Sequence, residues 1–347
     1  MIKELYIDGF KNLSNESFAL KNLTVLTGLN STGKSSVIQT LLLLSSVYTR
    51  EKKSFIKEVV KSFDKFSAIR NKYKNAKIVT INARNMGGQE YNISLSIDGM
   101  KTINSDRNAG DLEYEGNLYY LSANRMGQEE LALYDENQRF GAHGNYMFGY
   151  YEQHKDDMVY ESLIRETASL TLQSQLGYWL TNILGMKMDL KTEKITSSNV
   201  KVSFDSDGIT GLSPLNVGSG SSYLAKVLIM LLSAKAGDMV IVENPEVHLH
   251  PKAQAGLGDF FCFIARAGVQ VIVETHSEHF INKLRYEIYR SEISTDEVVI
   301  YYKKDIQGRF DKIDINKNGH FVNGSGQIVD FPKGFFDSTL AELLEIS

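Results

Sequence analysis

The sequence predicts an α/β protein with a mostly parallel central sheet, an antiparallel β layer beside it and an inserted helical subdomain. Three observations support this fold class. An apolar strand, a glycine-rich loop and an apolar helix follow one another in residues 23–44. Two more apolar strands, at 239–242 and 269–274, each precede a polar loop and a helix. Strands that alternate with helices are typical of a parallel sheet covered by helices on both faces.

Length and composition fit a folded protein with a sizeable core. The chain has 347 residues, of which 42% are hydrophobic and 23% charged, enough for one large domain or two. The longest apolar run, at 37–47, is interrupted by polar residues and is too short for a membrane span of about 20 residues. The N-terminus lacks the apolar core and cleavage site of a signal peptide. We therefore expect a cytoplasmic protein without a membrane segment.

The chain contains one cysteine, Cys262, in the apolar stretch FFCFIA. No internal disulfide can form, which favours a reducing compartment. A small buried side chain is the better interpretation of Cys262 than a nucleophile.

Charge is unevenly distributed along a chain whose formal net charge is −4. Residues 50–77 contain ten basic and three acidic residues, a local net charge of +7. Such a segment is a candidate contact for nucleic acid phosphates. It also has apolar residues at helical spacing, so a solvated face of a helix held on the protein body is the alternative.

The strongest motif is GLNSTGKS at 28–35, which lies between the first central strand and an apolar helix. This G-x-x-x-x-G-K-[ST] pattern predicts a phosphate-binding P-loop. The glycines let backbone N–H groups point at phosphate oxygens, Lys34 neutralises the β and γ phosphates, and the Ser35 hydroxyl is a ligand for Mg²⁺. ATP and Mg²⁺ are the predicted cofactors. The predicted contacts are Gly28, Asn30, Ser31, Thr32, Gly33, Lys34, Ser35 and Ser36.

The downstream segments follow the order of known nucleotide-binding motifs. The stretch NVGSGSSYLAKVLIMLL, the strand that ends in Glu243 and the tripeptide at 275–277 resemble the signature loop, Walker B strand and switch histidine of ABC-type ATPases. LNSTGKSS, SANR, ENPEVHLHP and ETHSEHFINKLR together are similar to the SMC-like ABC ATPases of bacterial anti-phage systems, relatives of the overcoming-lysogenization-defect proteins. The terminal FPKGFFD resembles the branch of that family without a nuclease domain.

This resemblance implies an ABC-type P-loop NTPase head formed by residues 1–50 and 200–347. Residues 50–200 are expected to form an inserted α/β subdomain, with the basic helix at 50–77, strands that join the antiparallel layer, and a helical stretch near 155–185. SMC-type proteins have a long coiled coil in this part of the chain. The sequence contains no sustained heptad repeat, so we expect no such arm.

The resemblance also implies a composite site shared by two chains. Two heads of this family enclose two nucleotides, so a homodimer or a higher oligomer is expected. Ser219 and Gly220, or the adjacent Gly218 and Ser221, would contact the γ-phosphate bound by the partner. The local pattern GSGSS alone is also compatible with a flexible turn.

The Walker B strand departs from the family pattern in one position. Glu243 takes the place of the carboxylate linked to Mg²⁺, and glutamate oxygen suits that ion. Asn244 stands where the family has the glutamate that polarises the attacking water, and an amide cannot accept a proton as a base. Slow hydrolysis is therefore predicted, with Asn244 or Glu246 placing the water and His276 sensing the γ-phosphate.

Other interpretations were open for some of these residues. The residues Glu246, His248, His250, His276, Glu278 and His279 could together hold a transition metal, although the ATPase motifs account for the same residues. Asp311 and Asp314 could be nuclease carboxylates, but no second acidic cluster accompanies them. Arg125 in SANR is predicted to contact a phosphate or to form a structural ion pair.

Three functions remain open from the sequence. The first is an ATPase whose dimer regulates or recruits a partner effector, a nuclease or toxin, in anti-phage defence. The second is a DNA-binding repair or clamp ATPase that uses residues 50–77. The third is a scaffold that binds ATP without hydrolysing it.

Overall fold

A seven-stranded sheet forms the centre of the computed structural model, which describes residues 1–48, 65–102, 112–332 and 335. Its strand order is β16-β15-β14-β3-β13-β12-β7. The five strands from β14 to β7 run parallel, and β15 and β16 continue the sheet antiparallel at one edge. The bounds are β3 Leu23–Gly28, β7 Leu118–Leu121, β12 Met239–Glu243, β13 Gln270–Glu274, β14 Val298–Lys303, β15 Asp311–Ile315 and β16 Phe321–Val322.

Both faces of this sheet are covered. Every residue of the parallel strands β3, β7, β12, β13 and β14 is buried, which explains why these strands read as continuous apolar runs. Successive side chains alternate between two cores: Val240 and Val242 pack into one, and Met239 and Ile241 into the other. The prediction of a mostly parallel sheet between two layers is confirmed.

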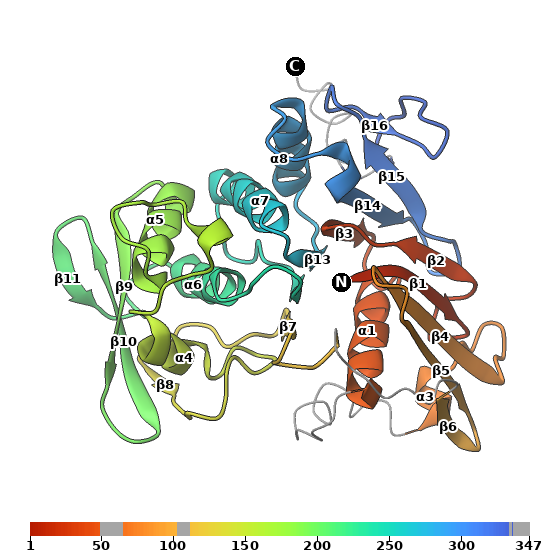
Figure 1. Cartoon of the computed structure of the whole chain (residues 1–347), viewed down its shortest axis with the longest axis horizontal. Coiled ribbons are helices and arrows are strands. Elements are labelled where there is room, and N and C mark those ends of the chain that lie inside the picture. Colours follow the sequence, from red (N-terminus) through yellow and green to blue (C-terminus); the bar gives the residue numbers. More distant parts are fainter. Residues whose placement is uncertain (49–64, 103–111, 333–334, 336–347) are drawn as a thin grey trace, which may run out of the picture.

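An antiparallel sheet and one helix cover the first face (Figure 1). The strand order of this sheet is β2-β1-β4-β5-β6. The helix α1, Lys34–Tyr48, starts directly after the glycine-rich loop and packs into the same core. The other bounds are β1 Ile2–Asp8, β2 Glu16–Ala19, β4 Ile78–Asn85, β5 Glu90–Ser96, β6 Gly99–Thr102 and α3 Phe66–Ile69. The predicted antiparallel β layer is confirmed.

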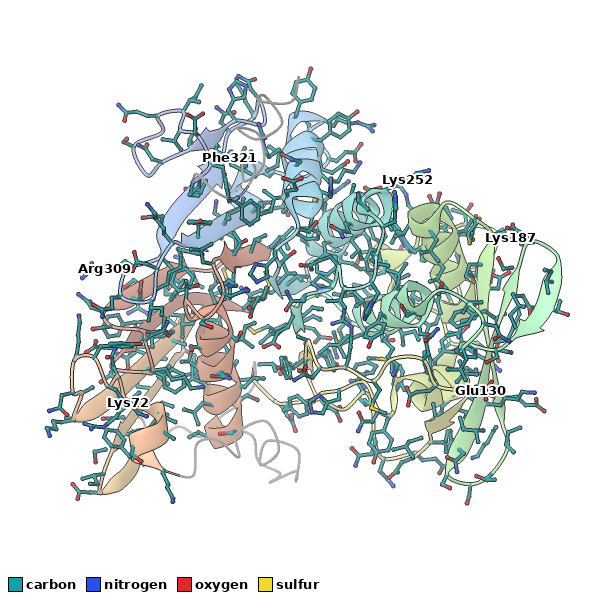
Figure 2. All side chains as sticks on the ribbon, turned by 180° about the vertical axis from the view of Figure 1, so that it is seen from behind. Lys72, Glu130, Lys187, Lys252, Arg309 and Phe321 are labelled. Atoms are coloured by element: carbon teal, nitrogen blue, oxygen red, sulfur yellow. The ribbon has the colours of Figure 1, made fainter. Side chains whose placement is uncertain are left out.

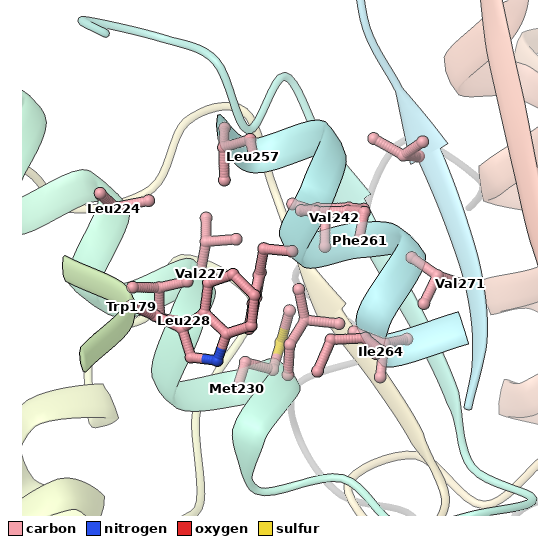
Figure 3. Close-up of a cluster of buried hydrophobic side chains, with 14 of the residues drawn as sticks. Trp179, Leu224, Val227, Leu228, Met230, Val242, Leu257, Phe261, Ile264 and Val271 are labelled. Atoms are coloured by element: carbon pink, nitrogen blue, oxygen red, sulfur yellow. The ribbon is translucent and has the colours of Figure 1, made fainter. Parts of the chain in front are cut away.

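Helices cover the second face. In the close-up of this core, Trp179 lies among apolar side chains of neighbouring helices (Figure 3), and its ring centroid is 4.8 Å from that of Phe260. A second antiparallel sheet, β8 to β11, lies at the outer end of this helical layer (Figure 1). The bounds are α4 Met147–His154, α5 Leu172–Leu184, α6 Ser219–Leu232, α7 Pro251–Arg266, α8 Glu278–Tyr289, β8 Leu131–Leu133, β9 Met188–Lys194, β10 Asn199–Ser206 and β11 Ile209–Leu212, with 3₁₀ turns at Glu161–Leu163 and Thr295–Glu297.

The predicted insert at 50–200 contributes to three sheets. Strands β4, β5 and β6 extend the antiparallel sheet, and β8, β9 and β10 belong to the outer sheet. Residues 118–121, expected in the antiparallel layer, instead form β7, which pairs in parallel with β12. This expectation was wrong because all four side chains are buried, as the edge of a covered parallel sheet requires.

Helix lengths in the insert also differ from expectation. Within the stretch predicted as helical near 155–185, the α-helix covers 172–184. The Thr171 side chain accepts a hydrogen bond from the Ser174 amide at its start, and Gly185 ends it at a φ of +74°. Residues 50–64 of the basic segment lie outside the described residues. None of the helices in the described ranges has the length and apolar character that crossing a membrane requires.

Candidate nucleotide site

The loop between β3 and α1 has a backbone that only glycine can form at its two ends. Gly28 has a φ of +133°, and a Cβ there would lie 2.2 Å from the carbonyl oxygen of Lys303. Gly33 has a φ of +112°, and a Cβ there would lie 2.4 Å from Oδ1 of Asn12. Any larger residue would force the loop away from β14 or from Asn12. The predicted roles of both glycines in shaping the loop agree with this geometry.

The loop offers backbone donors at its tip. The amides of residues 30–33 donate no hydrogen bond to any described residue. They lie just before the N-terminus of α1, where the helix dipole adds partial positive charge. Thr32 stabilises the loop through a bond from its hydroxyl to the Leu29 carbonyl, 2.8 Å long. Unpaired amides at a helix N-terminus form an anion-binding site.

Lys34 folds back over the loop. Its Nζ donates to the carbonyl oxygens of Gly28 at 3.1 Å and Leu29 at 2.8 Å, and only 3% of the residue is exposed. Burial lowers the pKa of this ammonium, while the nearby Glu274 carboxylate raises it. An ammonium group has three donors, so a phosphate can replace loop carbonyls as its partner.

The structure reveals a carboxylate that sequence reasoning missed. Glu274, the last residue of β13, accepts a hydrogen bond of 2.8 Å from the Ser35 hydroxyl. It lies in register with Glu243, the last residue of β12. Burial, and after it the charge of the neighbouring Glu243, raise the pKa of Glu274 to about 7. A signal was available: both predicted strands end in a glutamate just before a loop.

Glu243 faces the other neighbouring strand. Its Oε2 accepts a hydrogen bond of 3.1 Å from the amide of Ala123, directly after β7. Burial raises the pKa of Glu243, and its bond to the Ala123 amide opposes the rise. Glu243 is not among the residues that line the cleft at the P-loop, whereas Ser35 and Glu274 both line it.

The turn after β12 lies against the end of β13. Asn244 has a left-handed φ of +45°, and its amide donates to the carbonyl of Glu274 at 2.7 Å. Oε1 of Glu246 accepts a bond of 2.8 Å from the amide of His276, while its Oε2 is buried and has no partner among the described residues. The structure therefore brings three of the predicted catalytic residues, Asn244, Glu246 and His276, together at one strand end.

His276 is exposed at this strand end. Although part of the residue reaches the surface, burial of its ring and the charge of Lys34 together lower the pKa of His276 to about 4. The imidazole is therefore neutral at physiological pH. A neutral ring has one donor and one acceptor nitrogen, which suits a contact with phosphate through a single N–H.

The Arg125 side chain is held in a structural position, with backbone carbonyls as its hydrogen-bond partners. The residue is only 3% exposed, and its guanidinium donates to the backbone carbonyls of Glu243 at 2.9 Å and Asn244 at 2.8 Å. It also lies 5.2 Å from the ring centroid of Tyr223 on α6, a favourable cation–π distance. Burial lowers its pKa to about 10. Arg125 thus joins the turn after β12 to helix α6.

The predicted signature residues form the first turn of α6. Gly220 is buried, and a Cβ there would lie 2.6 Å from the carbonyl oxygen of His248. Ser219 is half-buried and Gly218 is exposed. Gly218 precedes the helix without a capping side chain. None of these residues lines the P-loop cleft of their own chain.

The cleft at the P-loop has a volume of about 470 Å³. Lys11, Arg70, Lys72, Tyr73 and Ile306 line it together with P-loop residues, and sequence reasoning assigned none of them to the site. Figure 2 shows Lys72 at the end of the molecule opposite to Lys187. The described part of the basic segment therefore contributes positive charge to this cleft.

A protein-only metal centre finds no support. No group of three His, Cys, Asp or Glu residues in the described ranges is arranged to hold a metal ion. Two histidines of the predicted rival site have other contacts: the ring of His248 lies 4.8 Å from that of Tyr223, centroid to centroid, and His250 caps α7. Asp314 is half-buried and pairs with Lys21 at 3.0 Å, and Asp311 is exposed on β15. Cys262 is buried, as predicted.

The donor groups at the cleft fit a nucleotide with Mg²⁺. Unpaired amides and Lys34 suit phosphate oxygens, and the Ser35 hydroxyl and Glu274 carboxylate supply the hard oxygen ligands that Mg²⁺ prefers. Mg²⁺ usually takes few protein ligands and completes its shell with phosphate and water.

Comparison with known protein families agrees with this site. Residues 23–282 match the AAA_21 family, described as "AAA domain, putative AbiEii toxin, Type IV TA system". The match spans the P-loop, the β12 and β13 strand ends and the first turn of α8. The chain belongs to the AAA_21 family. It is therefore a P-loop ATPase domain, with ATP as the nucleotide and Mg²⁺ as the expected ion. A comparison with curated proteins found no match.

Solved structures show what fold this AAA_21 domain has. An SMC head bound to the C-terminal winged-helix domain of ScpA is similar with a TM-score of 0.55 and 13% identity, over 91% of this chain and 98% of that chain. The SMC head with an extended coiled coil from Pyrococcus furiosus, bound to the C-terminal domain of ScpA, has a TM-score of 0.52 and 12% identity, over 99% of each chain. The AAA_21 domain therefore has the ABC/SMC-type head fold.

Proposed function

We propose that this protein is an Mg²⁺-dependent ATPase whose ATP-bound homodimer regulates or recruits an effector protein, a nuclease or toxin, in bacterial anti-phage defence. The observation that carries the proposal is the P-loop cleft: free amides, Lys34 and the Ser35–Glu274 pair are assembled in an SMC-type head. The name of the AAA_21 family, which cites a toxin and a toxin–antitoxin system, supports a paired effector.

A composite dimer is supported by the position of the signature residues. Gly218 and Ser219 are accessible at the N-terminus of α6 and take no part in the cleft of their own chain. The uncapped first turn of α6 suits a phosphate brought by a second chain. In a dimer with two-fold symmetry, the P-loop cleft of each chain would face the start of α6 of the other chain, which gives two equivalent sites. The similar SMC heads were solved with a domain of ScpA bound to them, so a head of this fold can bind a protein partner.

Slow turnover is the expected catalytic behaviour. Asn244 supplies no base, and its backbone is fixed by bonds to the Glu274 carbonyl and from Arg125. Glu246 has one oxygen free of described partners and can hold an attacking water. Bound Mg²⁺ would neutralise phosphate charge, and Lys34 would add to that effect from the protein. Positioning by these groups gives turnover without the usual glutamate.

The test is ATP turnover and nucleotide binding by the purified protein with Mg²⁺. We expect slow turnover that disappears in Lys34→Ala, falls at least about tenfold in Glu246→Ala, and changes little in Asn244→Ala. Glu136→Ala, on the loop after β8 and away from the cleft, is the matched control for removal of a glutamate.

Other outcomes would point to the alternative functions. Tight ATP binding without turnover would replace the ATPase with an ATP-gated scaffold. Turnover stimulated by DNA with a steep salt dependence would favour the DNA-binding clamp. Absence of ATP binding would overturn the proposal.

A further inference from the structure

We infer that Glu274 on β13, rather than the Walker B residue Glu243, is the carboxylate that binds the Mg²⁺ of the nucleotide together with Ser35. The inference rests on the proposed function, since it assigns the ion in the same cleft. It departs from the sequence pattern, in which the ion is assigned to the strand that ends in Glu243.

The position of the strands is the first argument. Strand β13 lies between the P-loop strand β3 and strand β12. Neighbouring strands are about 4.8 Å apart, so the end of β13 is one strand spacing closer to the P-loop than the end of β12. A glutamate at the end of β13 reaches Ser35 directly, and the bond of 2.8 Å shows that it does.

The partners of the two carboxylates are the second argument. Glu274 has a hydroxyl partner that is itself a P-loop side chain and lines the cleft. Glu243 accepts from the backbone amide of Ala123 and interacts with the Tyr120 hydroxyl, both from the β7 side of the sheet. If Glu243 turned toward the ion, the Ala123 amide would lose this hydrogen-bond partner, which disfavours such a movement.

The charge balance is the third argument. Glu243 and Glu246 are both close enough to Glu274 to repel its carboxylate electrostatically. Lys34 is the cation of the P-loop that acts on Glu274, and its Nζ is bonded to loop carbonyls. A divalent cation between Ser35 and Glu274 would offset this repulsion.

The test measures metal binding directly, with Mn²⁺ as the probe. Free Mn²⁺ is quantified by electron paramagnetic resonance while it is titrated into protein saturated with ADP, for the unaltered chain, Glu274→Gln and Glu243→Gln. Both substitutions replace a carboxyl group by an amide of nearly the same size, so each is the matched control for the other. A fluorescent ATP analogue in EDTA measures nucleotide binding without metal.

We expect Glu274→Gln to weaken Mn²⁺ binding at least about tenfold, because a direct ligand is lost, and Glu243→Gln to change it less than about threefold. Nucleotide binding in EDTA should stay within about threefold for both variants. Weaker Mn²⁺ binding in Glu243→Gln than in Glu274→Gln, or equal losses in both, would overturn the assignment. Failure of the unaltered chain to bind the ATP analogue would instead overturn the proposed function, and the assignment with it.

A second variant at position 274 distinguishes loss of the metal-binding carboxylate from a general loss of structure. Glu274→Asp keeps the carboxylate on a shorter stem, so it should bind Mn²⁺ more tightly than Glu274→Gln while its thermal unfolding stays similar. If Glu274→Asp and Glu274→Gln bind Mn²⁺ equally well, charge at this position does not hold the ion.

Discussion

The ends of β12 and β13 are adjacent, parallel and in register, and both carry a glutamate, yet the two side chains have different surroundings. Glu243 is held by the amide that follows β7. Glu274 is held by the hydroxyl of a P-loop serine. The difference comes from the strands on either side, since β12 borders β7 and β13 borders the P-loop strand.

This comparison teaches that strand order, more than residue type, assigns a role to a strand-end carboxylate. Each side chain bonds to the element beside its strand, and that element is set by the order of the parallel sheet. A sequence motif covers one strand and its loop, so it does not tell which strand lies beside it in the sheet.

Removal of Lys34, which lies near Glu274 at the end of β13, should cause the largest loss of ATP affinity. Lys34→Ala deletes the buried cation beside Glu274 and the phosphates, and the loss of a charged hydrogen bond costs about 1.5–3 kcal/mol. ATP affinity should fall about 10- to 100-fold, as measured by calorimetry. Lys187 lies at the end of the molecule opposite to Lys72 of the cleft, so Lys187→Ala is the control and should bind ATP as tightly as the unaltered chain does. Equal affinity in Lys34→Ala would contradict the P-loop assignment.

Truncation of the two glutamates should separate structure from binding. Glu243→Ala leaves the Ala123 amide without its carboxylate partner, so the free energy of unfolding should fall by about 1–3 kcal/mol. Glu274→Ala removes a repelled carboxylate that faces the cleft and should cost less than about 1 kcal/mol without ligand. Urea unfolding of the nucleotide-free proteins measures both. The reverse order of stability would contradict the different roles of the two strand ends.

The pH dependence of stability should identify Glu274. Its pKa is raised from 4.5 to about 7 in the folded protein, so between these values the folded state holds a proton that the unfolded chain has released. The free energy of unfolding should therefore fall as pH rises from about 5 to 7. The slope should become shallower in Glu274→Gln, which does not titrate. Urea unfolding at pH 5, 6, 7 and 8 provides the measurement, and an unchanged slope would exclude Glu274 as its source.

The smallest effect is expected at the outer part of the cleft. Tyr73 is 61% exposed and lines the cleft beside Arg70 and Lys72. Tyr73→Ala should weaken ATP binding by about 1 kcal/mol or less, through lost contact with the nucleotide. Tyr160→Ala, also exposed and remote from the cleft, is the matched control. Loss of binding as severe as in Lys34→Ala would mean that Tyr73 is essential to the cleft.

The sequence by itself determined the elements that depend on neighbouring residues. The P-loop, the buried strands and the start of α7 follow from glycine positions, continuous apolar runs and a helix-capping residue, which act within a few residues. The same local reasoning placed Asn244, Glu246 and His276 near one another, because parallel strands end at one edge of the sheet.

The tertiary structure alone decided which distant groups meet. Ser35 and Glu274 are separated by 239 positions in the chain, and Arg125 reaches the carbonyl of Glu243 across 118. Residues 118–121 joined the central sheet because burial on both faces outweighed their expected place in the antiparallel layer. These contacts depend on strand order and packing, which are set by the burial of the whole apolar surface and not by any single motif.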